Sequence, residues 1–163
     1  MHRSMWTRQI LKALSITASA VAVAAVAAAA PVGRPEATIK QFIDAFNKGD
    51  IKGAASTQAS DVAIIDEFPP HAWNGSGSFD KWLDDLQKDA KTKEQSDQKL
   101  TLGKTIRSQT DGDTAYVVMS ATFVYKEKGK PMKEPGQMAF ALSRDGDSWK
   151  IASWAWAGTP PRG

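Results

Sequence analysis

Two adjacent carboxylates, Asp66 and Glu67, follow an apolar run that is typical of a β-strand. Because side chains alternate along a strand, one carboxylate should face inward and the other outward. Asp66 shares parity with Val62 and Ile64, so we predict that Asp66 is the inward one. Burial in an apolar cavity would raise the pKa of its carboxyl and make it a usable acid or base near neutral pH. The alternative is a structural carboxylate that accepts hydrogen bonds from backbone amides of residues 72–75.

His71 is the second candidate for proton chemistry, because it is the only histidine after residue 2 and lies close to Asp66 in the sequence. It could transfer protons or be oriented by Asp66, or it could be a loop histidine with a single hydrogen bond. One histidine and no cysteine leave only carboxylates to complete a metal site, so we expect no metal. The sequence has no glycine-rich phosphate loop and no Ser/His/Asp or Cys/His arrangement, so it predicts no cofactor and offers no complete catalytic set.

Aromatic residues from several parts of the chain could line a ligand pocket. On the last predicted strand, Trp154 and Trp156 share one face, whereas Trp149 and Ile151 share the other, because side chains alternate. The face with Trp154 and Trp156 could line a pocket, stack on a flat ligand or pack in a dimer. This assignment depends on strand register, since a slip of one residue exchanges the two faces. The predicted ligand contacts are Phe42, Phe46, Trp73, Trp82, Tyr116, Phe140, Trp154 and Trp156.

The elements that must position these residues begin with a helix. Ile39, Phe42, Ile43 and Phe46 recur at i, i+3, i+4 and i+7, which predicts an amphipathic helix over residues 35–48. Its apolar stripe should place Phe42 and Phe46 toward the interior of the domain.

Further helices and a strand are predicted before residue 91. A short helix over 51–58 and a longer one over 78–90 flank a strand over 61–68. Asp50 and Ser78 are the expected N-cap residues of the two helices, because their side-chain oxygens can accept from the first free backbone N–H groups.

The last part of the chain changes to strand-like patterning. Three hairpin-turn sequences, at Asp111-Gly112, Lys128-Gly129 and Asp145-Gly146, separate runs rich in β-branched and aromatic residues. They predict a four-stranded antiparallel meander after a solvated connector over 91–97. The predicted strands are 100–109, 114–127, 132–144 and 148–157.

The order of helix, short helix, strand, loop, helix and four strands resembles the nuclear transport factor 2-like superfamily, which includes ketosteroid isomerases, polyketide cyclases and many secreted proteins. The resemblance is carried by residues 42–50 (FIDAFNKGD), 64–68 (IIDEF), 72–75 (AWNG) and 147–151 (DSWKI), and it covers residues 35–158. It implies an α+β fold in which a cone-shaped, strongly bent antiparallel sheet packs on three N-terminal helices and leaves an apolar pocket. It does not imply one reaction, because a fold hosts many functions.

For the ketosteroid isomerase-like branch, the resemblance implies an aspartate general base and a tyrosine hydrogen-bond donor in the pocket. Phe42 and Phe46 take the inward positions of the first helix, so that helix offers no phenol. This departure counts against steroid-isomerase chemistry. The two tyrosines, Tyr116 and Tyr125, both lie on the second strand of the predicted meander.

The first thirty residues indicate export to the periplasm or secretion. Arg3, Arg8 and Lys12 form a basic start, and residues 13–29 are an uncharged, small and apolar run that ends in consecutive alanines. This pattern is typical of a cleaved secretory signal peptide. An uncleaved membrane anchor is the alternative, and it is disfavoured because the run falls short of the about 20 strongly apolar residues of a spanning helix. The expected organisation is a signal peptide over 1–29, a linker over 30–34, a nuclear transport factor 2-like domain over 35–158 and a flexible tail over 159–163.

Charge limits the expected partners. The chain has a net charge of +3, and the three basic residues in excess are those of the first twelve positions. After residue 29 the chain holds 18 basic and 18 acidic residues, so the basic excess of a nucleic-acid binder is missing. The expected partner is a small apolar or aromatic molecule, with no nucleic acid and no membrane after cleavage. The family resemblance also implies a homodimer across the open face of the sheet.

Three functions remain open. The leading hypothesis is an exported domain that binds a small, partly apolar molecule without turning it over, because pocket candidates are plentiful and the catalytic set is incomplete. The second is an isomerase-, dehydratase- or cyclase-like enzyme with Asp66 as general base and His71 as its partner. The third is a dimerisation or protein-interaction domain that uses Trp154 and Trp156 as contacts.

Overall fold

Residues 33–163 are described in the structure, a computed structural model. The predicted signal peptide and most of the predicted linker lie outside these residues. None of the helices among residues 33–163 is long and apolar enough to cross a membrane. The elements are α1 (Pro35–Asn47), α2 (Ile51–Ser56), β1 (Gln58–Ile65), β2 (Ala72–Trp73), α3 (Ser78–Thr92), β3 (Gln95–Asp111), β4 (Thr114–Glu127), β5 (Lys130–Asp145) and β6 (Ser148–Gly158).

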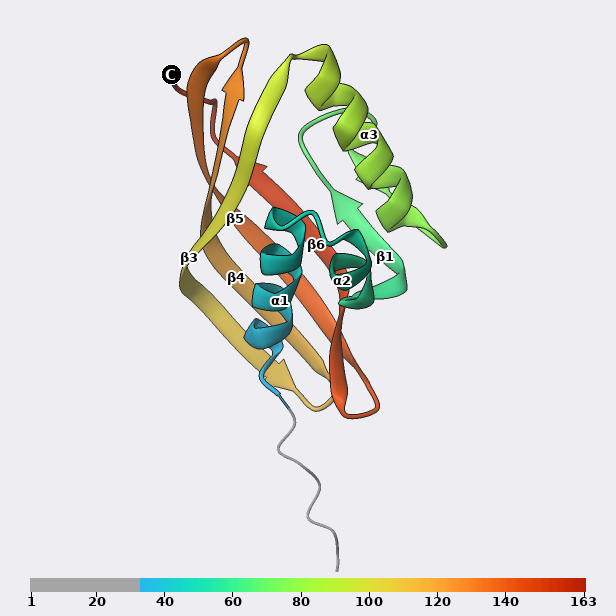
Figure 1. The fold of residues 1–163 in the computed structure, drawn as a ribbon. Coiled ribbons are helices and arrows are strands. Elements are labelled where there is room, and N and C mark those ends of the chain that lie inside the picture. Colours follow the sequence, from blue (N-terminus) through green and yellow to red (C-terminus); the bar gives the residue numbers. More distant parts are fainter. Residues whose placement is uncertain (1–32) are drawn as a thin grey trace, which may run out of the picture. The chain divides into compact units, whose positions relative to one another are not determined.

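The strands form one open sheet of six strands in the order β2-β1-β6-β5-β4-β3 (Figure 1). β3 to β6 are joined by tight turns and pair antiparallel, which confirms the predicted four-stranded meander. β1 joins the meander in parallel with β6, and the short β2 extends that edge. The helices lie on one face of the sheet, so the predicted α+β class is confirmed.

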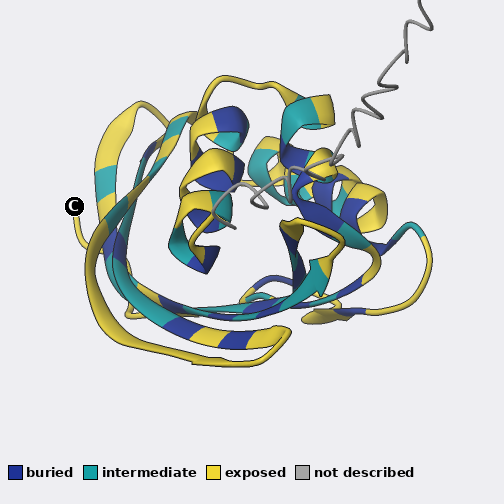
Figure 2. Cartoon of the chain, turned by 90° about the horizontal axis from the view of Figure 1, so that it is seen from below, coloured by how far each residue is buried: buried dark blue, intermediate teal, exposed yellow. Residues whose placement is uncertain are grey.

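The sheet bends around the helices (Figure 2). Ile39, Phe42 and Ile43 of α1 are buried against the sheet, as the predicted stripe requires. Val117 of β4 and Phe140 of β5 belong to the same buried cluster. This packing fixes α1 over the concave face, and with it the aromatic residues of α1 that face the cavity described below.

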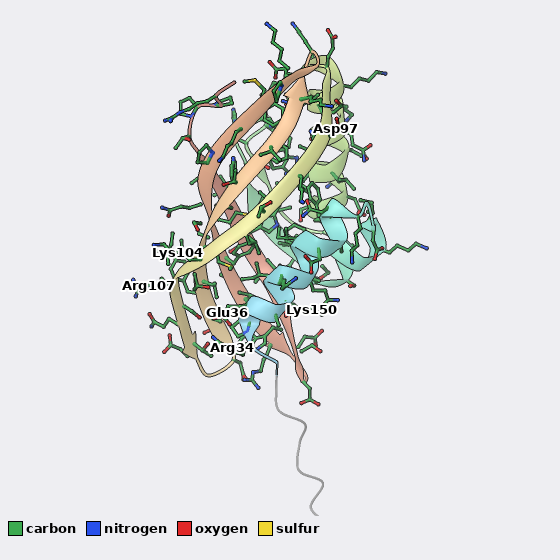
Figure 3. All side chains as sticks on the ribbon, turned by 60° about the vertical axis from the view of Figure 1, so that its left-hand side comes forward. Arg34, Glu36, Asp97, Lys104, Arg107 and Lys150 are labelled. Atoms are coloured by element: carbon green, nitrogen blue, oxygen red, sulfur yellow. The ribbon has the colours of Figure 1, made fainter. Side chains whose placement is uncertain are left out.

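Polar contacts hold both ends of α1 against β3. At the N-terminal end, the Ser108 hydroxyl donates to Glu36 Oε1 at 2.6 Å, beside Arg34 (Figure 3). At the C-terminal end, the Asn47 amide donates to the Leu100 carbonyl at 2.7 Å, and its Oδ1 accepts from the Leu100 N–H at 2.9 Å. These contacts fix α1 relative to the outer strand of the sheet.

The start of α3 corrects one of the cap predictions. Gly77, at φ +71°, is the N-cap, and Ser78 is the first helical residue. The Ser78 hydroxyl is buried and donates to the Val62 carbonyl, which ties α3 to β1. Asp50 does cap α2, since its Oδ1 accepts from the Gly53 N–H at 2.9 Å. Residue type alone predicted Asp50 and Ser78 as caps. It gave no signal that the Ser78 hydroxyl has a buried partner on another element.

Two segments predicted to be irregular make regular hydrogen bonds. α3 extends to Thr92 and β3 begins at Gln95, so these elements absorb most of the predicted connector over 91–97. Residues 159–163, predicted as a flexible tail, run back along β5. The Thr159 N–H donates to the Pro135 carbonyl at 2.9 Å, and an isolated bridge joins Arg162 to Lys133.

A β-bulge in β6 changes which of its residues share a face. Leu142 pairs with Ile151, whereas Phe140 pairs with Trp154, so Ala152 is an extra residue in β6. Directly paired residues point to the same face of a sheet, and Phe140 and Leu142 are both buried on the concave face. Ile151 and Trp154 therefore both point into the domain. The prediction that they lie on opposite faces is wrong, because it assumed uninterrupted alternation.

Candidate functional site

A cavity of about 370 Å³ lies between the helices and the concave face of the sheet. Most of its wall is aromatic or aliphatic, and its polar groups are mainly carboxylates. Ligand sites in proteins are typically concave, mostly apolar and of this size. The lining residues are Phe42, Phe46, Asp66, Glu67, Phe68, Trp82, Leu86, Asp89, Lys93, Gln95, Leu100, Phe123, Tyr125, Glu127, Met138, Trp154, Trp156 and Pro161.

Asp66 directly follows β1 and lines the cavity, in agreement with its parity. Its Oδ2 accepts from Trp82 Nε1 at 2.9 Å, and its Oδ1 accepts from the Glu67 backbone N–H at 2.7 Å. The alternative prediction, in which Asp66 accepts hydrogen bonds from backbone amides of residues 72–75, is therefore wrong, because neither donor belongs to these residues. Burial is the main cause that raises the pKa of Asp66 to about 6, and the negative charges of Glu67 and Asp89 add to the rise. The two hydrogen bonds lower the pKa, but by less than burial raises it. Asp66 therefore changes charge close to neutral pH.

A tight turn after β1 holds Asp66 in place. The Asp66 N–H donates to the His71 carbonyl at 3.1 Å, and the His71 N–H donates to the Phe68 carbonyl at 2.9 Å. The turn contains a cis bond between Pro69 and Pro70 and places His71 at φ +70°. The His71 side chain is exposed, and its Nδ1 lies 3.3 Å from the backbone oxygen of Asp66. In this geometry His71 does not line the cavity, and its ring contacts the main chain of Asp66.

A second acid, Glu134 of β5, is buried beside the cavity with 1% of its surface exposed. Its Oε1 accepts a hydrogen bond from Trp156 Nε1 at 2.9 Å. Burial raises the pKa of Glu134, and a hydrogen bond with the Glu67 carboxyl raises it further, because such a bond needs a proton between the two groups. Gly158 leaves room for this pair, since a Cβ there would overlap Glu134 Oε1 and lie 2.6 Å from Trp156 Nε1.

Paired polar side chains from α3, β3 and β4 complete the polar side of the cavity. Lys93 Nζ lies 2.8 Å from Asp89 Oδ2, and Gln95 Nε2 donates to Glu127 Oε2 at 3.3 Å. Tyr125 is buried next to them, and burial together with the surrounding carboxylates raises the pKa of its phenol. Among residues 33–163, no three His, Cys, Asp or Glu side chains lie close enough together to hold a metal ion.

The aromatic wall is a connected cluster. Trp154 packs edge-on against Trp82 with ring centroids 4.9 Å apart, and it packs against Phe42 at 5.9 Å. Phe46 lies 5.8 Å from Trp82 on the other side. Trp154 is 3% exposed, and its Nε1–H has no hydrogen-bond partner among the described residues. A buried donor without an acceptor is unfavourable.

Five of the eight predicted ligand contacts line the cavity, namely Phe42, Phe46, Trp82, Trp154 and Trp156. The other three do not. Trp73 is buried and donates its Nε1–H to Asp85 Oδ2 at 3.0 Å, and Phe140 lies within the core. Tyr116 is 45% exposed, and the Arg107 guanidinium lies 5.9 Å from its ring centroid. Tyr116 alternates with buried neighbours on β4 and therefore faces away from the cavity.

Sequence reasoning missed Glu134 and all five cavity residues of β3 and β4. Glu134 lies between a lysine and a proline close to a hairpin turn, so it looked like a solvated residue. Its parity with Met138 and Phe140 on the same strand was the signal that could have identified it. Tyr125 and Phe123 share inward parity with Val117, and the same test would have selected them.

Comparison with known proteins identifies the family and the fold of the chain. A family model described as SnoaL-like domain matches residues 36–156, and no curated protein matches the chain. The chain is similar to a ketosteroid isomerase-like protein from Erwinia carotovora atroseptica, with 21% identity over 77% of this chain and 94% of that chain, and a TM-score of 0.60.

Two further solved structures are similar to the chain. One is a hexachlorocyclohexane dehydrochlorinase, with 10% identity over 78% of this chain and 86% of that chain, and a TM-score of 0.64. The other is a nuclear transport factor 2-like superfamily protein from Salmonella enterica, with 14% identity, coverage of 78% and 89%, and a TM-score of 0.61. These likenesses confirm the nuclear transport factor 2-like fold, and at such identities they show the fold alone.

Proposed function

This chain belongs to the SnoaL-like domain family, and we propose that it binds a small, partly apolar molecule in the cavity between its helices and its sheet. The observation that carries the proposal is the cavity of about 370 Å³ with its largely aromatic wall. Such a wall gives a ligand apolar contact area, and the polar groups on one side give it an orientation.

The packing of the wall supports a preformed site. Phe42, Phe46, Trp82 and Trp154 contact one another at ring distances between 4.9 and 6.4 Å. Trp82 is further fixed by its hydrogen bond to Asp66. Because these side chains are already held in the free protein, a ligand does not have to order them on binding, and less affinity is lost to entropy.

Tryptophan fluorescence tests this proposal, since Trp82, Trp154 and Trp156 all line the cavity. The purified protein is titrated with a panel of neutral aromatic and alicyclic molecules, and at least one should give a saturable change. Phe123→Ala removes a cavity contact and should weaken binding by about fivefold or more, which corresponds to about 1 kcal/mol. Tyr116→Ala on the same strand faces outward and should leave the affinity unchanged. No saturable response, or equal weakening by both variants, contradicts the proposal.

A second candidate function is proton transfer by Asp66, and the placement and raised pKa of that carboxyl favour it. Above pH 6 the ionised carboxylate can accept a proton from a bound ligand, and below it the protonated form can donate one. A hexachlorocyclohexane dehydrochlorinase has the same fold, so the fold is compatible with this class of chemistry. The position of Asp66 supports an isomerase-, dehydratase- or cyclase-like reaction on a molecule that the cavity holds.

Substitution of Asp66 separates turnover from binding. Ligands found by fluorescence are incubated with the protein, and products are detected by mass spectrometry. Asp66→Asn should abolish turnover and retain binding, whereas Asp85→Asn, which alters a carboxylate outside the cavity lining, should retain both. His71→Ala should also retain turnover, because the imidazole contacts only the main chain of Asp66. Unchanged turnover by Asp66→Asn contradicts proton transfer by this residue.

Export and self-association are further proposals. The basic and apolar pattern of the first thirty residues supports export to the periplasm or secretion after cleavage near residue 29. The mass of the protein recovered from the exported fraction tests this, and an uncleaved chain contradicts it. A homodimer would use the convex face of the sheet, since Trp154 and Trp156 line the cavity. Sedimentation equilibrium distinguishes such a dimer from a monomer.

A further inference from the structure

The cavity carries an unbalanced negative charge. Its lining includes four carboxylates, Asp66, Glu67, Asp89 and Glu127, and one basic side chain, Lys93. Lys93 is paired with Asp89 at 2.8 Å, so three carboxylates have no cation among the residues that line the cavity. After residue 29 the chain holds equal numbers of acidic and basic residues. The negative excess is therefore a local property of the cavity.

Buried Glu134, behind the wall, responds to this excess. Its carboxyl hydrogen bonds with Glu67, and the charges of Glu67 and Asp66 both disfavour its ionisation. The phenol of Tyr125, on the neighbouring strand β4, is also affected by Glu67, together with Glu127, Glu134 and Asp89. These groups therefore share one field, which an apolar wall focuses across the cavity because it excludes water.

The aromatic wall provides the second half of a cation site. Ring faces attract positive charge, with tryptophan the strongest, and the lining holds Trp82, Trp154 and Trp156.

We infer that the cavity takes an organic cation, in which a protonated amine or quaternary ammonium group is attached to an aromatic or other apolar body. This inference rests on the proposed binding function and names the ligand class for the same site. The positive group faces the carboxylates, and the apolar body packs on the aromatic wall. A neutral molecule of the same shape buries the same area and leaves the carboxylates uncompensated. An anion is repelled.

Three probes of one shape test the inference by tryptophan fluorescence. They are choline phenyl ether, its neutral isostere with carbon in place of the ammonium nitrogen, and its sulfonate analogue. All three carry the same phenyl ring and ether oxygen, so only the charge differs. At pH 8 and low salt, we expect the cation to bind at least about tenfold more tightly than the isostere and the sulfonate to bind weakest. Added salt should weaken binding of the cation and leave the isostere unchanged.

Variants locate the effect in the cavity. Glu127→Gln removes one lining charge and keeps a side-chain oxygen that can accept from Gln95, so it should weaken binding of the cation by about threefold or more without changing binding of the isostere. Asp84→Asn removes the same charge from the exposed face of α3, outside the lining, and should change neither affinity.

The outcomes distinguish this inference from the binding function on which it rests. Saturable binding of the isostere with equal or greater affinity than the cation overturns the inference and leaves the binding function intact. An equal loss of cation affinity for Glu127→Gln and Asp84→Asn also overturns it, since the preference would then be a property of overall charge. Failure of all three probes to bind overturns the inference, whereas the binding function is contradicted only if the neutral panel also gives no saturable response.

Discussion

Replacement of Asp66 by asparagine is expected to stabilise the protein above neutral pH. The pKa of Asp66 is about 6 in the folded protein, against an ordinary value of 3.8, and burial is the main cause. At about 1.4 kcal/mol for each pH unit between these values, the ionised carboxylate costs the folded state about 3 kcal/mol at pH 8. Asparagine does not ionise and escapes this cost. Its amide N–H₂ must take the place of an oxygen that accepts a hydrogen bond, which reduces the expected net gain to about 1–2 kcal/mol.

The sign of the pH dependence follows from the direction of the shift. Between pH 4 and 6 the folded state binds more protons at Asp66 than the unfolded state does, so the free energy of unfolding falls as the pH rises through this range. Below pH 4 the side chain is protonated in both states and the cost is absent. The advantage of Asp66→Asn should therefore be full at pH 8 and vanish at pH 4.

Urea unfolding of both proteins at pH 8, 6 and 4 measures this difference. The control is Asp85→Asn, because hydrogen bonds from Trp73 and Lys88 hold the pKa of Asp85 below its ordinary value. Loss of that carboxylate should give no stabilisation at any pH. If Asp66→Asn is equally destabilised at pH 8 and pH 4, then burial does not disfavour the ionised carboxylate, and the reasoning for Asp66 as an acid or base is refuted.

Two further substitutions test the geometry around the carboxyl groups. Trp82→Phe removes the indole N–H that favours the ionised form of Asp66. Because such a hydrogen bond contributes about 1.5 kcal/mol, the pKa of Asp66 should rise by about one pH unit. An NMR titration of the Asp66 carboxyl carbon measures this pKa, and an unchanged or lower value contradicts the prediction. Gly158→Ala places a methyl group on the carboxyl of buried Glu134 and should lower the free energy of unfolding by about 1–3 kcal/mol, whereas Gly33→Ala meets no neighbouring atom and should have no effect in the same assay.

Much of the fold could be predicted from the sequence, because local rules apply to it. The stripe that includes Ile39 and Phe42 has the period of a helix and packs on the sheet as expected. The turn sequences predicted the meander correctly. Each hairpin turn contains a glycine at positive φ, such as Gly112 and Gly146, because these types of turn require that conformation. The inward position of Asp66 followed from simple alternation along one short strand.

The rest depends on contacts between distant parts of the chain. The extra residue Ala152 has no signature in the sequence, and it reversed the expected relation between Ile151 and Trp154. Ser78 resembled a cap because its buried partner lies on another element. Glu134 was overlooked because only its neighbours in space show that a charged side chain close to a hairpin turn is buried. Candidate residues can therefore be named from sequence, but the composition of the cavity requires the register of the whole sheet.

The bulge at Ala152 also bears on how this domain can diverge. A bulge bends and twists its strand. Here Ala152 and Ser153 together lie opposite Ala141, so Ile151 and Trp154 on either side of the bulge both point into the domain. A chain shorter by this one residue would present the same side chains on a straighter strand, with less curvature around the cavity. The volume of the cavity and the chemistry of its wall can therefore be varied independently, the first by the number of residues in β6 and the second by their identity.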